Sequence, residues 1–238
     1  EGRNAVLEAF RSGKTVDRLF VLDGCQDGPV KTILREAKKQ DTMVQYVKKE
    51  RLDQLSETKN HQGVIAYCAA CEYAEVSDIL ENAKKKGEAP FIVLLDGIED
   101  PHNLGAIIRT ANQAGAHGVI IPKRRAVGLT ATVARTSAGA VNYTPVAKVT
   151  NLVTVMEDLK KEGMWFVCAD MDGEMMYNLD LKGSIGLVIG SEGQGISKPV
   201  RDAATHHLAL PMRGGAESLN ASVAAGILLY EAAKQRCT

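Results

Sequence analysis

The sequence predicts an α/β protein built as two domains, a small one followed by a larger one. Apolar stretches of strand length alternate with amphipathic stretches of helix length along the whole chain. The chain has 238 residues, enough for one large domain or two modest ones. Its composition, 45% hydrophobic and 24% charged, is that of a globular protein.

Helix and strand alternate three times in the first part of the chain. Val6, Leu7 and Phe10 recur at helical spacing, and Gly13 stands where such a helix would end. The elements expected are helices over 3–13, 29–39 and 48–55 and strands over 18–22, 42–47 and 63–68. We therefore expect a small α/β layer domain over residues 1–70.

Residues 71–89 are predicted to be a linker. They combine a short helical stretch with a lysine run, 84–86, of the kind that most often marks a solvated face. Just before them, Cys68-Ala-Ala-Cys71 has the spacing of half a zinc site. A structural zinc needs four ligands and no second pair lies nearby, so we expect no metal.

The larger domain is expected over residues 90–238. It begins with Phe91–Leu95, a continuous apolar run typical of a strand buried on both faces of a parallel sheet. Further strands are expected at 118–122, 165–169, 185–190 and 207–210, and helices at 103–115, 129–136, 150–162, 197–204 and 218–235. This alternation predicts a mostly parallel sheet with helices on both faces, which binds ligands beyond the carboxyl ends of its strands.

A polar segment follows the first strand of that sheet and opens a helix. Asn103 lies where an N-cap would be. Arg109 follows among Ala and Ile residues, where a charge is costly unless it is paired or reaches the helix edge.

Two further segments combine glycines with polar side chains. Gly190-Ser-Glu192-Gly193-Gln-Gly195 follows a strand, and its glycines would let a ligand approach the backbone. The other runs from Leu210 to Ser218-Leu219-Asn220 at the start of the last helix, where Ser218 is a plausible N-cap. A helix N-terminus there would also suit an anionic group.

Together the three segments resemble, in order and spacing, motifs 1, 2 and 3 of the SpoU (TrmH-like) family of SPOUT RNA methyltransferases. The resemblance covers about residues 91–238, and the N-terminal part is similar to the ribosomal-protein-like RNA-binding domain of RlmB-like enzymes. It implies a catalytic domain closed by a trefoil knot, which periodicity cannot predict. It also implies a homodimer that uses S-adenosylmethionine to methylate a ribose 2′-hydroxyl, with a guanosine of 23S ribosomal RNA as the expected target.

The resemblance also implies residue roles. Catalysis would rest on Asn103, Arg109, Glu192, Ser218 and Asn220. The cofactor would lie against Gly190, Gly193, Leu210, Met212, Ser218 and Leu219. Arg109 would activate the hydroxyl, but a guanidinium resists deprotonation, which favours a cation that clamps a phosphate and stabilises the developing alkoxide. The dimer surface would come from Leu219, Val223, Ile227, Leu228 and Tyr230 on the last helix.

RNA contacts are expected from basic and polar side chains outside these segments. The candidates are Arg3, Asn4, Lys123, Arg124, Arg125 and Arg135. The formal net charge of zero neither supports nor excludes RNA binding. Only 5% of residues are aromatic, so no base-stacking platform is expected.

Two other classes remain open at this stage. The chain could be an RNA-binding or ribosome-assembly protein that lost its chemistry, and within the family its target could be transfer RNA. An oxidoreductase of the doubly wound type is disfavoured, because no early glycine fingerprint is present. No secretory signal or membrane-spanning run is visible, so we expect a cytoplasmic protein with reduced thiols and no membrane partner.

Overall fold

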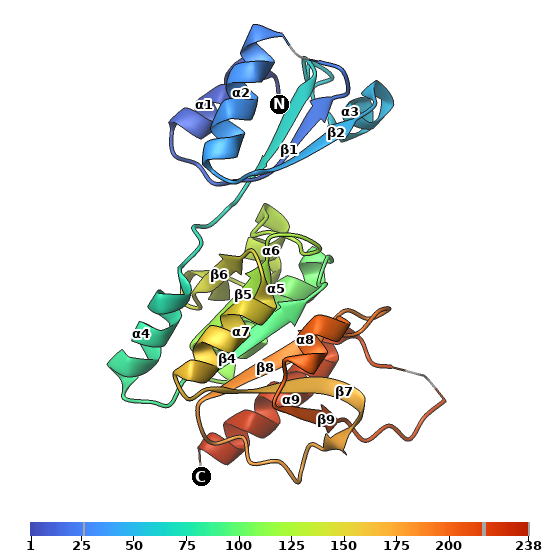
Figure 1. Cartoon of the computed structure of the whole chain (residues 1–238). Coiled ribbons are helices and arrows are strands. Elements are labelled where there is room, and N and C mark those ends of the chain that lie inside the picture. The colour runs from blue at the N-terminus through green and yellow to red at the C-terminus, as the bar shows by residue number, and fades with distance from the viewer. Residues whose placement is uncertain (26, 216–217, 238) are drawn as a thin grey trace. The chain divides into compact units, whose positions relative to one another are not determined.

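The computed structural model describes residues 1–25, 27–215 and 218–237, and the chain divides into two compact units. The smaller unit holds Glu1–Glu72 and Gly128–Ala131, and the larger holds Tyr73–Val127 and Thr132–Thr238. Figure 1 shows the elements of both in chain order.

The smaller unit has the predicted alternation of helix and strand. Its elements are α1 (Arg3–Arg11), β1 (Val16–Leu22), α2 (Gly28–Lys39), β2 (Met43–Val47), α3 (Lys49–Leu55) and β3 (Val64–Cys68). The sheet has the order β2-β1-β3, with β1 parallel to β2 and antiparallel to β3. Because side chains alternate along β1, Leu19 and Val21 pack with α1 and α2, whereas Phe20 packs with α3 on the opposite face.

The stretch for which the sequence predicts a linker contains a helix, α4 (Val76–Lys86). Its Ile79 and Ala83 are fully buried, and Ile79 belongs to the core of the larger unit. A Cβ on Gly118 would lie 2.5 Å from Cγ1 of Ile79, so this glycine makes room for the helix. The lysine run does face solvent, but the apolar side of the helix makes it part of the larger unit.

The larger unit is a parallel α/β structure, as predicted. Its elements after α4 are β4 (Phe91–Asp96), α5 (Pro101–Gln113), β5 (Gly118–Pro122), α6 (Ala131–Thr136), the 3₁₀ helix η1 (Ala140–Asn142), β6 (Val146–Val149), α7 (Leu152–Lys161), β7 (Trp165–Met175), β8 (Ile185–Gly190), α8 (Lys198–Asp202), β9 (His206–Ala209) and α9 (Ala221–Arg236). The sheet order is β6-β5-β4-β8-β7-β9, and every neighbouring pair is parallel.

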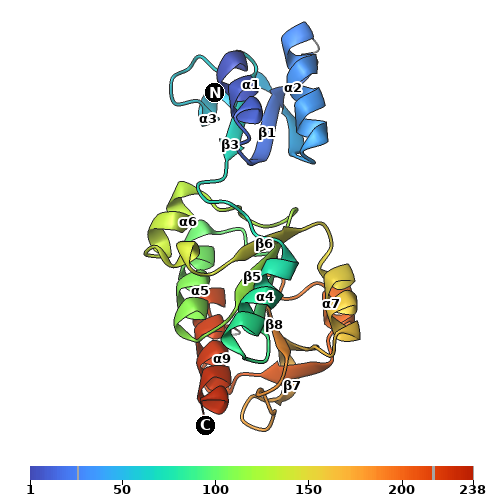
Figure 2. The same ribbon diagram turned by 90° about the vertical axis from the view of Figure 1, so that its left-hand side faces the viewer.

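Helices cover both faces of this sheet. Side chains of α4, α7 and α8 share one core with residues of β4, β7 and β8. On the other face α5 and α9 run side by side, as Figure 2 shows. The trefoil knot stays a prediction, with which the insertion of β8 between β4 and β7 is compatible.

Two strands differ from the sequence-based expectation. β6 has only four residues, and Lys148 interrupts its apolar run, so no strand pattern is evident there. β7 continues past the predicted end to Met175, because after an irregularity it pairs with β9 a second time.

Candidate active site

The candidate site is built where β4 and β8 end side by side. Asp96 and Gly190, the last residues of the two strands, are partners in the sheet register. Asp96 is only 5% exposed, and its Oδ2 accepts a hydrogen bond from the backbone nitrogen of Ser197 at 2.8 Å. This contact ties the end of the 191–197 loop to the end of β4.

Three side chains from three separate segments meet at this edge. Nδ2 of Asn103 donates to Oε1 of Glu192 at 2.8 Å, and Nδ2 of Asn220 donates to Oδ1 of Asn103 at 3.1 Å. Nδ2 of Asn220 also donates to the same Glu192 oxygen, which accepts a further bond from the Ala221 nitrogen at 3.4 Å. We call Asn103, Glu192 and Asn220 the polar triangle.

The caps of the two helices at the triangle differ from those predicted. The N-cap of α5 is Asp100 rather than Asn103, and its carboxylate accepts from the backbone nitrogens of His102 and Asn103. The reason is Pro101, which suits the first turn of a helix and so sets the start just after Asp100. The Asp100-Pro101 pair was therefore a usable sequence signal.

At α9 the N-cap is Asn220 rather than Ser218. Oδ1 of Asn220 accepts from the backbone nitrogens of Ser222 and Val223 at 3.0 and 3.3 Å. Asn220 thus caps the helix with its oxygen and joins the triangle with its nitrogen. The helix N-terminus carries partial positive charge, so it favours the Glu192 carboxylate beside it.

Arg109 and Ser218 do not join the triangle. Both are exposed, and neither side chain makes a hydrogen bond or ion pair with any residue in 1–25, 27–215 or 218–237. Arg109 follows Asn103 by six residues on α5, which turns its side chain about 240° around the helix and about 9 Å along it. Its guanidinium is therefore free to meet a group from outside.

Glycines in the expected cofactor segments fall into two kinds. A Cβ on Gly190 would lie 2.3 Å from the carbonyl carbon of Gly195, so the chain returns against the end of β8. A Cβ on Gly193 would meet nothing within 4 Å, so internal packing does not require this glycine. Its bare backbone therefore fits the close approach of a ligand. Of the other cofactor candidates, Met212 is exposed and Leu210 and Leu219 are half-buried.

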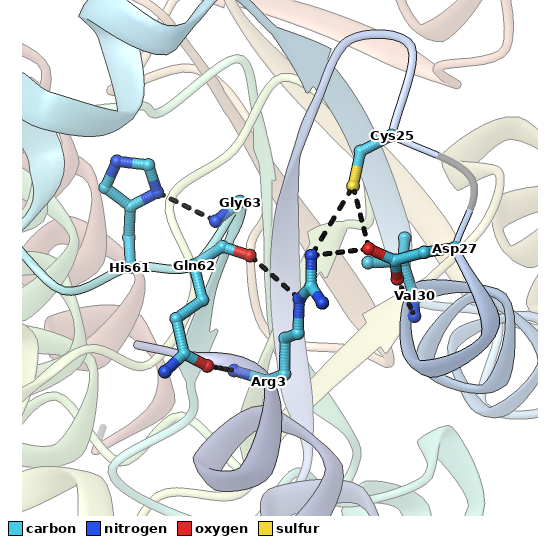
Figure 3. Close-up of polar contacts among 7 residues, drawn as sticks. All are labelled: Arg3, Cys25, Asp27, Val30, His61, Gln62 and Gly63. Carbon is cyan, nitrogen blue, oxygen red and sulfur yellow. Dashed lines mark hydrogen bonds and ion pairs between the residues drawn. The ribbon is translucent and has the colours of Figure 1, made fainter.

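Arg3, an RNA candidate, is held inside the smaller unit (Figure 3). Its guanidinium pairs with Asp27 at 2.5 Å and donates to the Gln62 carbonyl at 3.1 Å, while its backbone nitrogen donates to Oε1 of Gln62. It also reaches the Cys25 sulfur at 3.9 Å. Arg3 therefore links α1 to the start of α2 and to the turn before β3, a structural role that its sequence context does not indicate.

The other RNA candidates lie at the surface. Asn4, Arg124, Arg125 and Arg135 are exposed and Lys123 is half-buried. Arg125 has a φ of 55°, which marks a tight turn after β5. Within the described part of the chain, no three His, Cys, Asp or Glu side chains gather as metal ligands. Nor does that part contain a helix both long and apolar enough to span a bilayer.

Comparison with known families adds two matches. The model of the SpoU rRNA methylase family matches residues 90–230, and the model of the RNA 2′-O ribose methyltransferase substrate-binding domain matches residues 1–74. The first covers the strand ends and the polar triangle, and the second covers the Glu1–Glu72 part of the smaller unit.

Individual relatives agree over nearly the whole chain. A putative TrmH family tRNA/rRNA methyltransferase of Bacillus subtilis is 47% identical over 236 residues, covering 99% of this chain and 94% of that protein. The crystal structure of the SpoU methyltransferase AviRb from Streptomyces viridochromogenes with the cofactor AdoMet matches with a TM-score of 0.64 and 26% identity, covering 99% of this chain and 89% of that one.

An AdoMet-bound rRNA methyltransferase from Sinorhizobium meliloti matches with a TM-score of 0.62 and 26% identity, covering 98% of this chain and 85% of that one. The range matched by the SpoU rRNA methylase model includes the three segments that meet at the ends of β4 and β8. The chain therefore belongs to the SpoU rRNA methylase family.

Proposed function

We propose that this chain transfers the methyl group of S-adenosylmethionine to the 2′-hydroxyl of a ribose in structured RNA, with a guanosine of 23S ribosomal RNA as the target, in the cytoplasm. Family membership makes the chain an RNA methyltransferase that uses S-adenosylmethionine. The observation that carries the proposal is the polar triangle, in which Asn103, Glu192 and Asn220 meet although they lie in three separate segments.

S-adenosylmethionine, when bound, supplies an electrophilic methyl group. Backbone groups around Gly190, Gly193, Leu210, Met212, Ser218 and Leu219 would hold it. The open space at Gly193 is compatible with this assignment, because a Cβ there would meet no atom within 4 Å and a ligand therefore has room beside the backbone. Gly190 serves indirectly, because its missing side chain lets the 191–197 loop close against β8.

The nucleophile is a weakly acidic hydroxyl that must be aligned and must lose its proton as the bond forms. In the triangle, Oε1 of Glu192 is occupied by three donors. Its other oxygen accepts no hydrogen bond from the described residues, so it can accept one from the ribose hydroxyl. Asn103 and Asn220 would fix the carboxylate in that orientation.

Arg109 would act as a cation on the RNA. It carries no carboxylate partner among the described residues, so its charge is available to clamp a phosphate and stabilise the developing alkoxide. Ser218, exposed next to the cofactor segment, would complete the site. Lys123, Arg124, Arg125, Arg135 and Asn4 would add further contacts to the RNA.

The outer face of α9 supports a homodimer. Val223, Ile227 and Tyr230 are 50%, 38% and 55% exposed and recur at helical spacing, while Leu229 and Ala232 face the core. A helix that is apolar on both sides needs a partner on its outer side as well. Leu228, expected on this surface, is fully buried and belongs to the inner side instead.

The test is methylation of total RNA from a strain that lacks the gene, with labelled S-adenosylmethionine and mapping of blocked 2′ positions. We expect one labelled guanosine in 23S ribosomal RNA. Label in transfer RNA would instead make transfer RNA the target, the other RNA class that the name of the Bacillus subtilis relative includes. If no RNA is labelled and calorimetry detects no heat of S-adenosylmethionine binding, the chain would instead be an RNA-binding protein without methyltransferase activity.

The role of Arg109 has its own test. With Arg109→Lys, a cationic clamp loses rate at all pH values because the bidentate geometry is lost. If the basic limb of the pH–rate profile moves instead, Arg109 abstracts the proton.

A further inference from the structure

One face of the sheet in the smaller unit is covered only in part. Phe20, Leu52 and Ile65 form a small core in which α3 closes over the end of the sheet. The strand register continues this face to Arg18, Met43, Gln45 and Tyr67, which we call the open half-face. On the opposite face the sheet carries the core shared with α1 and α2.

An exposed aromatic ring lies on the edge strand of the open half-face. Tyr67 is 42% exposed, although it sits on the last strand of a small sheet. Its ring meets the ring of Phe20 edge-to-face, with centroids 5.7 Å apart and an interplanar angle of 72°. Phe20 is anchored in the core below α3, so this contact helps to fix the position of the tyrosine ring.

The charge beside this ring is positive and unbalanced. Arg18 is the cross-strand partner of Tyr67, and its guanidinium carbon lies 6.0 Å from the centroid of Phe20. Arg18 forms no ion pair with the described residues. None of the described strand residues on the same face of the sheet as Phe20 is acidic. Gln45, exposed on β2, adds amide donors and an acceptor.

An exposed ring, a guanidinium without an ion pair and an amide match the chemistry of a nucleotide, which offers a flat base, a phosphate and polar base edges. A protein partner would not need the cation, and a duplex would hide its bases from the ring. We propose that the open half-face binds unpaired nucleotides of RNA, with a base stacked on Tyr67 and a phosphate on Arg18. This inference rests on RNA being the substrate, and it adds a base-stacking site for which the low aromatic content gives no indication.

The test uses the full chain and a fluorescein-labelled single-stranded oligouridine of about twelve nucleotides, long enough for a small single-strand site. Fluorescence anisotropy gives the Kd for wild type, Tyr67→Ala, Tyr67→Phe and Tyr46→Ala. Tyr46 is the matched control, because it is 56% exposed but shares the opposite face of the sheet with Val44 and Val21. Circular dichroism checks that each variant is folded.

We expect Tyr67→Ala to weaken binding by about fivefold or more, as the loss of one stacked base predicts. Tyr67→Phe and Tyr46→Ala should bind as wild type does. Arg18→Gln should lower the slope of log Kd against log salt by about 0.7, because one phosphate contact is lost. Equal binding by Tyr67→Ala and Tyr46→Ala, or an unchanged salt slope for Arg18→Gln, would overturn the proposal.

Methylation of 23S ribosomal RNA by the same preparations separates this inference from the proposed function. If wild type methylates and Tyr67→Ala has an unchanged KM and Kd, the half-face does not bind RNA although the function holds. If wild type binds the oligonucleotide through Tyr67 but transfers no methyl group to any RNA, the open half-face does bind RNA and the proposed methyltransferase function is wrong. Tighter binding to a duplex of the same length than to the single strand would also contradict a stacked base.

Discussion

A single oxygen of Glu192 receives donors from Asn103, Asn220 and the start of α9, so it joins three segments at once. We expect Glu192→Ala to lower the rate of methyl transfer about tenfold to hundredfold, since hydrogen bonds to a charged group contribute about 1.5–3 kcal/mol. Glu192→Gln keeps an acceptor and should lose less. Single-turnover rates on the mapped RNA would check this.

The stability of both Glu192 variants should stay within about 1 kcal/mol of wild type, because the triangle lies at the surface where water replaces lost partners. If Glu192→Ala turned over at the wild-type rate, the polar triangle would not be part of the active site.

His117 is a buried polar residue beside Phe91, the first residue of β4, whereas the candidate site lies at the other end of that strand. Its Nδ1 accepts a hydrogen bond from the Phe91 nitrogen at 3.0 Å, which places the ring proton on Nε2, 3.1 Å from Glu88. Burial lowers the pKa of His117 below its ordinary value, with Lys86 adding to the effect and Glu88 opposing it. The neutral ring therefore belongs to the folded state.

Because the pKa of His117 is lower in the folded than in the unfolded chain, protonation favours unfolding. This part of the stability is complete above about pH 6.5 and is lost progressively as the pH falls below it. Urea unfolding at about pH 7.5 and about pH 5.5 would measure the difference in free energy. His117→Gln should show a smaller difference than wild type, and an equal one would contradict the assignment.

At the scale of elements, the loop after β8 depends on two glycines in different ways. Gly190→Ala would place a Cβ 2.3 Å from backbone, so we expect a loss of stability of about 1–3 kcal/mol. Gly193→Ala meets open space and should leave stability within about 0.5 kcal/mol. Thermal unfolding would compare the two.

Calorimetry with S-adenosylmethionine would measure how the Gly193 substitution affects cofactor binding. Gly193→Ala should weaken cofactor binding despite its normal stability, because its methyl group would occupy ligand space. A normal cofactor Kd for Gly193→Ala would show that the loop does not approach the cofactor.

The alternation of helix and strand was predictable because most elements have the periodicity of their type. The parallel sheet followed from runs such as Phe91–Leu95, buried on both faces. β6 could not be predicted, because this four-residue strand depends on its pairing with β5, which the sequence of β6 alone does not indicate. The helical stretch before the lysine run was expected, but its packing into the larger unit was not, because its buried residues are only Ile79 and Ala83 and three lysines follow them.

For the candidate site, the sequence predicted the residues that belong to the three motifs but not the details of their geometry. The resemblance brought Asn103, Glu192 and Asn220 together, which the structure supports with direct contacts. Which side chain caps each helix depends on backbone geometry at single residues, and there Asp100 and Asn220 replaced the expected caps. The open half-face depends on register between strands, which composition cannot reveal.

At the scale of the whole molecule, the apolar outer face of α9 predicts self-association. We expect the wild-type chain to sediment as a dimer at micromolar concentration, and Val223→Glu with Tyr230→Glu to sediment as a monomer, since two buried charges would oppose the contact. Met171→Glu is the control, because Met171 is 71% exposed and belongs to β7 rather than to α9. A wild-type chain that sediments as a monomer would contradict the dimer.

The polar triangle joins residues that are 117 positions apart in the chain, Asn103 and Asn220. During translation, a nascent chain has made β4 and α5 long before the ribosome releases the segment that carries Asn220. A polypeptide that ends before Asn220 therefore lacks one corner of the triangle. On the role proposed for the triangle, full methyl transfer would have to wait until nearly the whole larger unit has been synthesised, and a chain terminated before Asn220 would be a poor enzyme.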